Sequence, residues 1–516
     1  MGESKLKLAK RAKRLMSCAG VQTVAGRVQV RWETESAATP MGQLAYFIEF
    51  LTLTGLWSRW QENCPLAYNS PNAPGKADVL GTWMLSVLAG HKRYAHVTAI
   101  RCDGVNPGLL GMNKVISEDA LRNALKRIPQ AEGCAWLDGH LTGSVAPLLD
   151  APWILDIDTT VKPLYGKQEG AVISYNPNKP GRPSHTYHTY LMAGLRQVLG
   201  VEVHSGNEHA ARHTQPGLLK LLDDLPQERK PALVRGDSSF GNDSLMTALE
   251  ERQQSYLFKL KLSKNVKRHI GRLFRENGWT DAGQGWEGRD GMLRLSGWEQ
   301  ARRVVVLRRP LKGEVVIAQE DNGQQLLGFV EADRQAGRQI TGYECAVLVT
   351  NTGYEILGLG QLYRDRADAE NAFDELKNQW GWGGFTTHDL HRCQLSARTV
   401  ALIYNWWSLF VRLANPQARR EAITSRPWLM SAVGRRTEHA GKTTITLTGQ
   451  HAAFGRARAA LMRVSTLLQG WAAHAAEQLN ATTVWNLVCD HLKCVLAAVG
   501  SPQSHLFLAN HANGIG

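Results

Sequence analysis

The sequence predicts an α/β protein whose core is interrupted by a β-rich insertion and flanked by mostly helical regions. Three observations support this prediction. Short apolar strands alternate with helical patterns after residue 150, helical periodicity is lost after Phe274, and apolar residues recur at helical spacing in both flanking regions. We therefore divide the chain into 1–148, 149–262, 263–350, 351–415 and 416–516.

Composition points to an anionic partner. The 516 residues include 60 Lys and Arg against 46 Asp and Glu, a net charge of +14, which favours nucleic acid first and a membrane surface second. The apolar stretch 399–411 lies between Arg398 and Arg412 and is too short to cross a bilayer, so we expect no membrane span. Eight scattered cysteines with no CxxC pair predict neither a zinc site nor a disulfide framework, and fit a reducing compartment.

The region 1–148 is expected to be mostly helical and to bind nucleic acid through its helices. Apolar spacing predicts helices over 41–62 and 77–93, and Ser117 is a good N-cap for a third helix with acids in its first turn. Three basic residues on that helix could face DNA or form an ordinary solvated face, and both interpretations stay open: Arg122, Lys126 and Arg127.

The first core segment alternates strands and helices. Strands are predicted over 152–160, 185–193 and 198–204, in an antiparallel meander. A helix over 213–225, a short strand over 232–235, a helix capped by Asn242 and a strand over 256–262 follow. Within the insertion we expect strands over 293–295, 303–307 and 313–317, and 343–349 leads back to the core. Helices are predicted over 362–380 and 396–414, and the last region is largely helical with one strand near 442–448.

Three acids stand out by their positions. Asp156 and Asp158 lie two apart on an apolar strand and therefore share a face, where carboxylates are costly unless paired or metal-bound. Asp237 follows the strand 232–235, at the end where functional groups gather in open α/β sheets. The alternative is that each of these acids only bonds backbone at a strand end or caps a turn.

The predicted helix 362–380 carries a polar stripe. If it is continuous from Tyr363, then Arg366, Glu370 and Lys377 fall with it inside an arc of about 60°. A solvated, salt-bridged face would look similar. Acids from two strands and a later helix would suit two Mg²⁺ ions roughly 4 Å apart, acting on a phosphodiester.

Basic residues near these acids suggest phosphate contacts, although an ordinary basic surface remains the alternative. Lys259 and Lys261 are expected on one face of the strand after Asp237. Two runs without acids follow: Lys264, Lys267, Arg268, Arg272 and Arg275, then Arg302, Arg303, Arg308, Arg309 and Lys312.

These motifs resemble a known family. Tyr363-x2-Arg366-x3-Glu370-x6-Lys377 matches the Y-x2-R-x3-E-x6-K signature of bacterial insertion-sequence transposases with a DDE active site. The segments 155–160 and 235–241 resemble the two aspartate blocks of that family. The resemblance covers residues 150–415 and implies an RNase H-like core carrying a β-rich insertion.

The resemblance implies roles for particular residues. Asp158, Asp237 and Glu370 would be the catalytic, metal-binding triad, holding two Mg²⁺ ions, for which Mn²⁺ can substitute. Asp158 is preferred to Asp156 because the family's aspartate precedes the Thr pair. Tyr363, Arg366 and Lys377 would hold phosphates. In relatives a Trp of the insertion stacks on a flipped base, and Trp298 or Trp286 would do so here.

The implied activity is cut-and-paste transposition at terminal inverted repeats, by nicking followed by attack of the freed 3′-OH. A homodimer on double-stranded DNA is expected, with helices of residues 416–500 as candidate contacts, in the bacterial cytoplasm or nucleoid. Two alternatives stay open: a structure-specific nuclease on the same core, and a domesticated, catalytically inactive DNA-binding protein. His185 and His188 lie three apart, hence on opposite strand faces, and we expect no shared metal between them.

Overall fold

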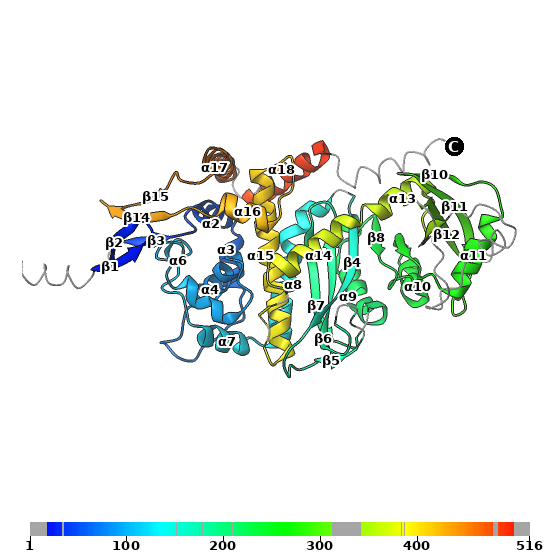
Figure 1. Cartoon of the computed structure of the whole chain (residues 1–516), viewed down its shortest axis with the longest axis horizontal. Helices are drawn as coiled ribbons and strands as arrows, with labels where there is room; N and C mark the ends of the chain where they lie inside the picture. The colour runs from blue at the N-terminus through cyan, green and yellow to red at the C-terminus, as the bar shows by residue number, and fades with distance from the viewer. Residues whose placement is uncertain are drawn as a thin grey trace, which may run out of the picture.

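The protein is an elongated α/β molecule with a large mixed sheet. The computed structural model describes residues 18–499 apart from 33–35, 151, 175, 177–178, 209, 312–341, 383, 386 and 478–482. A helical lobe occupies one end, the sheet continues from the middle to the other end, and α15 (Leu390–Ala414) lies beside it (Figure 1). In the described part of the chain, no helix meets the length and apolarity that a bilayer crossing requires.

Within the described residues the large sheet has ten strands, in the order β10 (Thr280–Gly283), β11 (Trp286–Leu293), β12 (Arg302–Pro310), β13 (Tyr343–Thr350), β9, β8, β4, β6 and β5, with β7 also paired to β6. The strands nearest the predicted acids are β4 (Ile154–Pro163), β6 (Pro183–Met192), β7 (Gln197–Ser205), β8 (Leu233–Gly236) and β9 (Tyr256–Lys259). β4, β6 and β7 form the predicted antiparallel meander, and β4, β8 and β9 are parallel. The short β5 (Val172–Ile173) was not predicted.

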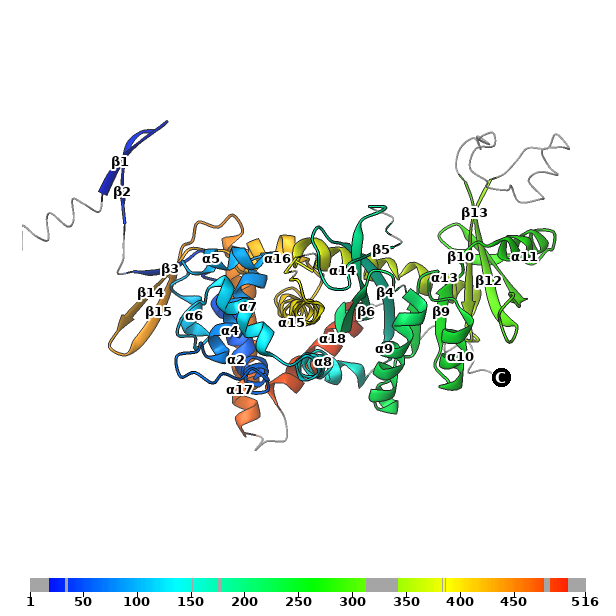
Figure 2. The same ribbon diagram turned by 90° about the horizontal axis from the view of Figure 1, so that it is seen from below.

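Helices cover both faces of this sheet. α9 (Ala210–Asp224) and α10 (Asp243–Glu251) lie on one face, whereas α13 (Ile356–Arg364) and α14 (Ala367–Gln379) cross the other; Figure 2 shows α9 and α14 on opposite sides of the strands. The predicted cap of α10 is confirmed, because the Asn242 side chain accepts a hydrogen bond from the Leu245 amide.

The insertion extends the same sheet. After α11 (Lys264–Phe274), the strands β10 (Thr280–Gly283), β11 (Trp286–Leu293) and β12 (Arg302–Pro310) form an antiparallel ribbon, and β13 (Tyr343–Thr350) joins that ribbon to β9. The predicted return strand is confirmed, and the predicted strand 313–317 lies outside the described residues. Hydrogen bonding across β9 and β13 therefore makes insertion and core one continuous sheet.

The two flanking regions pack together. β3 (Ala37–Thr39) pairs with β14 (Gly434–His439), which pairs with β15 (Lys442–Leu447), and α2 (Leu44–Leu53) packs on α17 (Phe454–Glu477). Ser117 caps α7 as predicted, accepting a hydrogen bond from the Ala120 amide at 3.2 Å. The hairpin of β1 (Cys18–Thr23) and β2 (Gly26–Arg31) was not predicted and stands away from the body (Figure 2). The helices of this lobe are α2 (Leu44–Leu53), α3 (Leu56–Glu62), α4 (Lys76–Leu88), α5 (Val97–Ile100), α6 (Asn106–Leu109), α7 (Glu118–Arg127), α8 (Gln130–Val145), α16 (Ala422–Leu429), α17 (Phe454–Glu477) and α18 (Val484–Val499).

α15 connects the lobe to the sheet. Most of its residues are buried, because it packs on α8 and β7 on one side and on α2, α4 and α17 on the other. A helix that is apolar on nearly all sides is buried, either in a protein core or in a membrane, and here other elements of the same protein cover it. The apolar stretch 399–411 is therefore the buried link between the two halves of the molecule.

Candidate active site

Strand register places two of the predicted acids side by side. Ile157 of β4 is the parallel partner of Gly236 of β8, so Asp158 and Asp237 are the next residues on neighbouring strands. Neighbouring strands lie about 4.8 Å apart, and residues in register point to the same face. The Asp237 carboxylate accepts a hydrogen bond from the Ser239 amide at 2.9 Å, which fixes it at the start of the following turn.

Asp156 shares that face but has a different partner. Its two oxygens accept hydrogen bonds from Arg235, each at 2.7 Å, and both side chains are almost completely buried. Arg235 also donates to the Leu362 carbonyl oxygen, tying β4 and β8 to α13. Asp156 is thus fully occupied in a buried ion pair, which leaves Asp158 as the available acid of the strand.

Glu370 reaches the site from α14, in a way that corrects the predicted helix. The segment 362–380 is not one helix: α13 ends at Arg364 and α14 begins at Ala367, with a turn at 365–366. Tyr363 and Glu370 are therefore on different helices, and the expected continuous stripe does not exist. The turn instead directs Arg366 into the sheet, where it donates to Asp158 at 3.1 Å and to Glu370 at 2.8 Å.

Burial and charge set the protonation of this group. Burial raises the pKa of Asp158, Arg366 and Lys377 oppose the shift, and the negative charges of Asp237 and Glu370 add to it. Burial also raises the pKa of Tyr363 to about 12, so its phenol is a hydrogen-bond donor at neutral pH. The acids thus repel one another and are held together by the Arg366 guanidinium, whose side chain is only 4 % exposed.

The donor chemistry fits hard divalent cations. Three carboxylates lie on this face of the sheet, and the Arg366 guanidinium already places a positive charge between two of them, Asp158 and Glu370. In the described part of the chain, however, the ligand oxygens of the three acids do not all come within 4.8 Å of one another. Glu370, 64 % exposed at its side chain, can move, whereas Asp158 and Asp237 are set by the sheet.

The predicted lysines differ in position. Lys259 ends β9 one residue beyond the partner of Gly236, which continues the row of Asp158 and Asp237 across three parallel strands. Lys261 lies after the end of β9 and is exposed, so the prediction that both lysines share a strand face was wrong. Lys377, on α14, is close enough to lower the pKa of Asp158.

Trp298 is not placed to stack on a base. It is 7 % exposed and lies under the Arg302 guanidinium, 5.4 Å from the ring centroid. Trp286 is half-buried, with Arg309 over its ring at 4.8 Å. The prediction for Trp298 therefore conflicts with its burial, because a buried indole has no free face for a nucleotide.

The two basic runs have different environments. Among the described residues, none of the five basic side chains of the first run, which lie on or just after α11, takes part in an ion pair. In the second run every described arginine pairs with an acid: Arg302 with Asp243 and Glu250, Arg303 with Asp290, Arg308 with Glu287 and Arg309 with Glu344. Lys312 lies outside the described residues. The second run is thus a neutralised surface of β12.

The basic residues of α7 also differ in whether they have a partner. Arg122 pairs with Glu118 at 2.6 Å and lies over the Tyr94 ring, and Arg127 lies over the ring of Tyr68. Lys126 is exposed. The ordinary solvated or packed role therefore accounts for the two arginines.

Sequence reasoning missed Arg235 and the place of Arg366. A signal for Arg235 was present, because an arginine that ends an apolar strand two residues after Leu233 must find a buried partner. For Arg366 no local signal exists, since its contact with Asp158 spans 208 residues of sequence.

The chain is similar to known proteins in two comparisons. Residues 150–406 match the family of transposase DDE domains, so about half of the chain carries this domain. A solved structure entitled "Cryo-EM structure of piggyBac transposase synaptic complex with hairpin DNA" is similar at a TM-score of 0.34 and 10% sequence identity, covering 90% of this chain and 88% of that one. No curated protein matches the chain.

Proposed function

We propose that this chain, whose residues 150–406 match the transposase DDE domain, is a DNA transposase that moves an insertion sequence by cut-and-paste transposition. The observation that carries the proposal is the convergence of Asp158, Asp237 and Glu370 at the face of one sheet, within a segment that matches this domain. The strand order β7-β6-β4-β8-β9, three antiparallel and then parallel, supports an RNase H-like core.

Asp158, Asp237 and Glu370 would hold two Mg²⁺ ions, with Mn²⁺ as a substitute. Such ions, when bound, activate a water or a 3′-OH and stabilise the leaving oxygen of an in-line displacement. Asp158 and Asp237 supply the rigid part of the site, because their positions are fixed by strand register. Glu370 completes it by turning away from Arg366.

Arg366, Tyr363 and Lys377 would then face the DNA backbone. The guanidinium that bridges Asp158 and Glu370 is released when these acids take other partners, and it can donate two hydrogen bonds to a phosphate. Tyr363, kept protonated by its raised pKa, adds a neutral donor. Lys259, in line with the two aspartates, supplies a further positive charge beside the scissile strand.

The reaction has two displacements at phosphorus. In the first, water attacks a phosphodiester at the end of the element, the P–O3′ bond breaks and a free 3′-OH is left. In the second, that 3′-OH attacks a target phosphodiester and releases the target's own 3′-OH, so the number of phosphodiester bonds is unchanged. We propose that this occurs in a homodimer on terminal inverted repeats, in the bacterial cytoplasm or nucleoid.

A cleavage assay tests the function. The chain and its Glu370→Gln variant are incubated with DNA carrying the ends of its own element, with and without Mg²⁺. Metal-dependent cuts at the repeat boundary that fall by at least about 100-fold in the variant are expected, because one carboxylate ligand is lost. DNA binding by the variant, measured by gel shift, is the control and should persist.

Two other outcomes would assign the chain differently. Cuts that depend on DNA structure but not on the repeat sequence would indicate a structure-specific nuclease. Binding of the repeats without cuts in either protein would indicate a catalytically inactive DNA-binding protein.

A further inference from the structure

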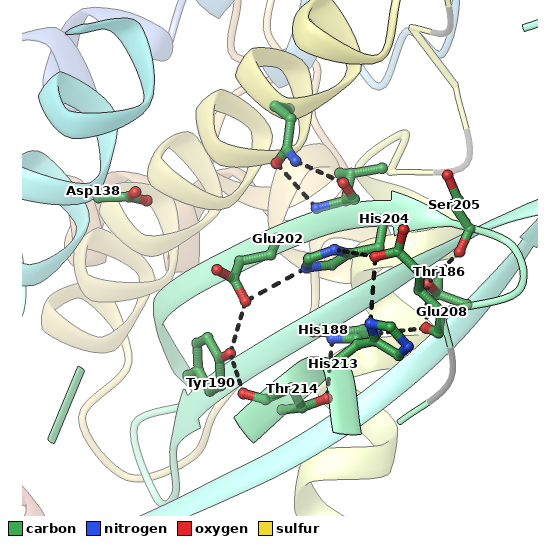
Figure 3. A network of polar contacts seen from close by, with 12 residues as sticks. Asp138, Thr186, His188, Tyr190, Glu202, His204, Ser205, Glu208, His213 and Thr214 are labelled. Carbon is green, nitrogen blue, oxygen red and sulfur yellow. Dashed lines mark hydrogen bonds and ion pairs between the residues drawn. The ribbon is translucent and has the colours of Figure 1, made fainter. Parts of the chain in front are cut away.

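A second polar cluster lies on the opposite face of the same sheet. His188 of β6 is the cross-strand partner of Glu202 of β7, and His204 follows on the same face of β7. Asp158 pairs with Thr189, the neighbour of His188, so the strand alternation places the carboxylate site and this cluster on opposite faces. Figure 3 shows the three side chains converging beside α9.

We propose that His188, Glu202 and His204 form a transition-metal site that takes Zn²⁺ or a similar ion. Within the described residues they are the one group of three His, Cys, Asp or Glu side chains whose ligand atoms all lie within 4.8 Å of one another. Two imidazoles and a carboxylate are a donor set that zinc uses in proteins. Zinc bonds of about 2.0–2.1 Å would bring these atoms to roughly 3.4 Å from one another, which shortens each separation by at most about 1.4 Å.

His204 has the surroundings of a metal ligand. Its Nδ1 lies 2.9 Å from a Glu208 carboxylate oxygen, and its Nε2 is buried without a hydrogen-bond partner, 3.7 Å from Glu202. A histidine that binds a metal through one nitrogen typically holds the other against a carboxylate, which fixes the ring. Glu208 thus has the place of the outer carboxylate (Figure 3).

The His188 ring is also positioned for metal binding. Its ring is fully buried and lies beside the His204 ring at a tilt of 30°, with 4.5 Å between the centroids. One nitrogen contacts the Glu208 carbonyl oxygen at 3.2 Å and the other the Thr214 hydroxyl at 3.0 Å, and the hydroxyl can rotate away.

α9 is shaped to close over the cluster. A Cβ at Gly217 would come within 2.2 Å of a Glu202 oxygen and 2.4 Å of the Tyr190 hydroxyl, which itself donates to Glu202 at 2.9 Å. Gly217 follows Pro216 inside the helix, and both residues weaken a helix. The presence of Pro216 and Gly217 inside the helix is explained if the close approach of the α9 backbone to Glu202 matters more than helix propensity. An ion here would cross-link β6, which supplies His188, to β7, which supplies Glu202 and His204.

Cobalt provides the direct test. The full chain, stripped with a chelator, is titrated with Co²⁺ and then with Zn²⁺. One equivalent of Co²⁺ should give the intense visible bands of a four-coordinate ion, without the near-ultraviolet band of sulfur ligands, and Zn²⁺ should remove them. His204→Gln and Glu202→Gln should weaken binding on the order of 100-fold or more.

The control variants separate this site from others. Asp158→Asn removes a carboxylate on the opposite face and should retain the full signal, and so should His185→Gln, because His185 contacts the Glu169 carbonyl oxygen instead. Circular dichroism verifies folding, and the rise in melting temperature that Zn²⁺ causes in the wild type should be lost in His204→Gln. Absence of binding by the wild type, or unchanged binding in both His204→Gln and Glu202→Gln, would overturn the proposal.

Discussion

The two faces of the central sheet hold polar side chains in contrasting ways. On the α14 face, two of three acids contact one arginine, all three remain partly exposed, and burial raises the pKa of Asp158. On the α9 face, histidines and glutamates are enclosed by a network of hydrogen bonds within β6, β7 and α9. The first arrangement leaves ligand positions open for chemistry, whereas the second suits a permanent, structural role.

The comparison also runs along one strand. Asp156 and Asp158 share a face of β4, yet Asp156 is neutralised by Arg235 in a buried pair while Asp158 is left with an arginine that it shares. Two identical side chains, two residues apart, therefore have different tasks: one holds the sheet to α13 and the other is available to a ligand. The pairing of the neighbouring strand, and not the residue type, decides which is which.

Asp156→Asn should have the largest effect on stability. It leaves the fully buried Arg235 without its counter-charge, and removing one partner of a buried pair costs about 3–5 kcal/mol. Asp158→Asn is the matched variant and should leave the free energy of unfolding unchanged or raise it, because burial and the neighbouring acids disfavour the charge at that position. Urea denaturation of both variants measures the difference.

A loss of stability in Asp158→Asn as large as in Asp156→Asn would contradict the division of roles. It would mean that the Arg366 contacts, like those of Arg235, are chiefly structural.

The sequence predicted the elements better than their contacts. Apolar runs marked β4 and β8, and Ser117 and Asn242 marked two helix starts, because such signals are local. The Asp156–Arg235 pair was not predictable, since it depends on the register of strands 79 residues apart. The turn at 365–366 contains neither Gly nor Pro, so nothing local showed that the helix breaks and directs Arg366 inward.

The same limit explains the histidine cluster. The alternation rule correctly separated His185 from His188, yet it could not show that His188 faces Glu202 and His204, because only the β6–β7 register brings them together. The scattered cysteines predict no zinc site of cysteine ligands, but they give no information on sites built from histidine and glutamate. Paired strands rich in His and Glu at period two are the pattern to examine.

Gly217→Ala should give the next largest loss of stability. It tests how closely α9 packs over the cluster of His188, Glu202 and His204. Forcing a methyl group against Glu202 and Tyr190 is expected to cost about 1–3 kcal/mol, more than the gain in helix propensity. Gly143→Ala, in α8, is the control: a Cβ there meets nothing within 4 Å, so this variant should be as stable as wild type or more so. Equal thermal stability of both variants would show that the cluster tolerates a looser cover.

The smallest expected effect is on the salt dependence of DNA binding, and it compares the two basic runs. The basic residues of α11 have no acidic partner among the described residues, whereas the arginines of β12 are paired with acids. Arg268 of α11 is exposed and donates a hydrogen bond to the Asn265 amide oxygen, whereas Arg309 of β12 pairs with Glu344 at 2.6 Å. If α11 contacts the DNA backbone, Arg268→Ser should lower the slope of log K against log salt by about 0.9, since one phosphate contact and its counterion release are lost. Arg309→Ser should leave the slope unchanged, because Glu344 already neutralises that arginine. Fluorescence anisotropy over a salt series measures both slopes. Equal slopes in the two variants would contradict the prediction, because pairing with an acid would then not decide which basic residues contact DNA.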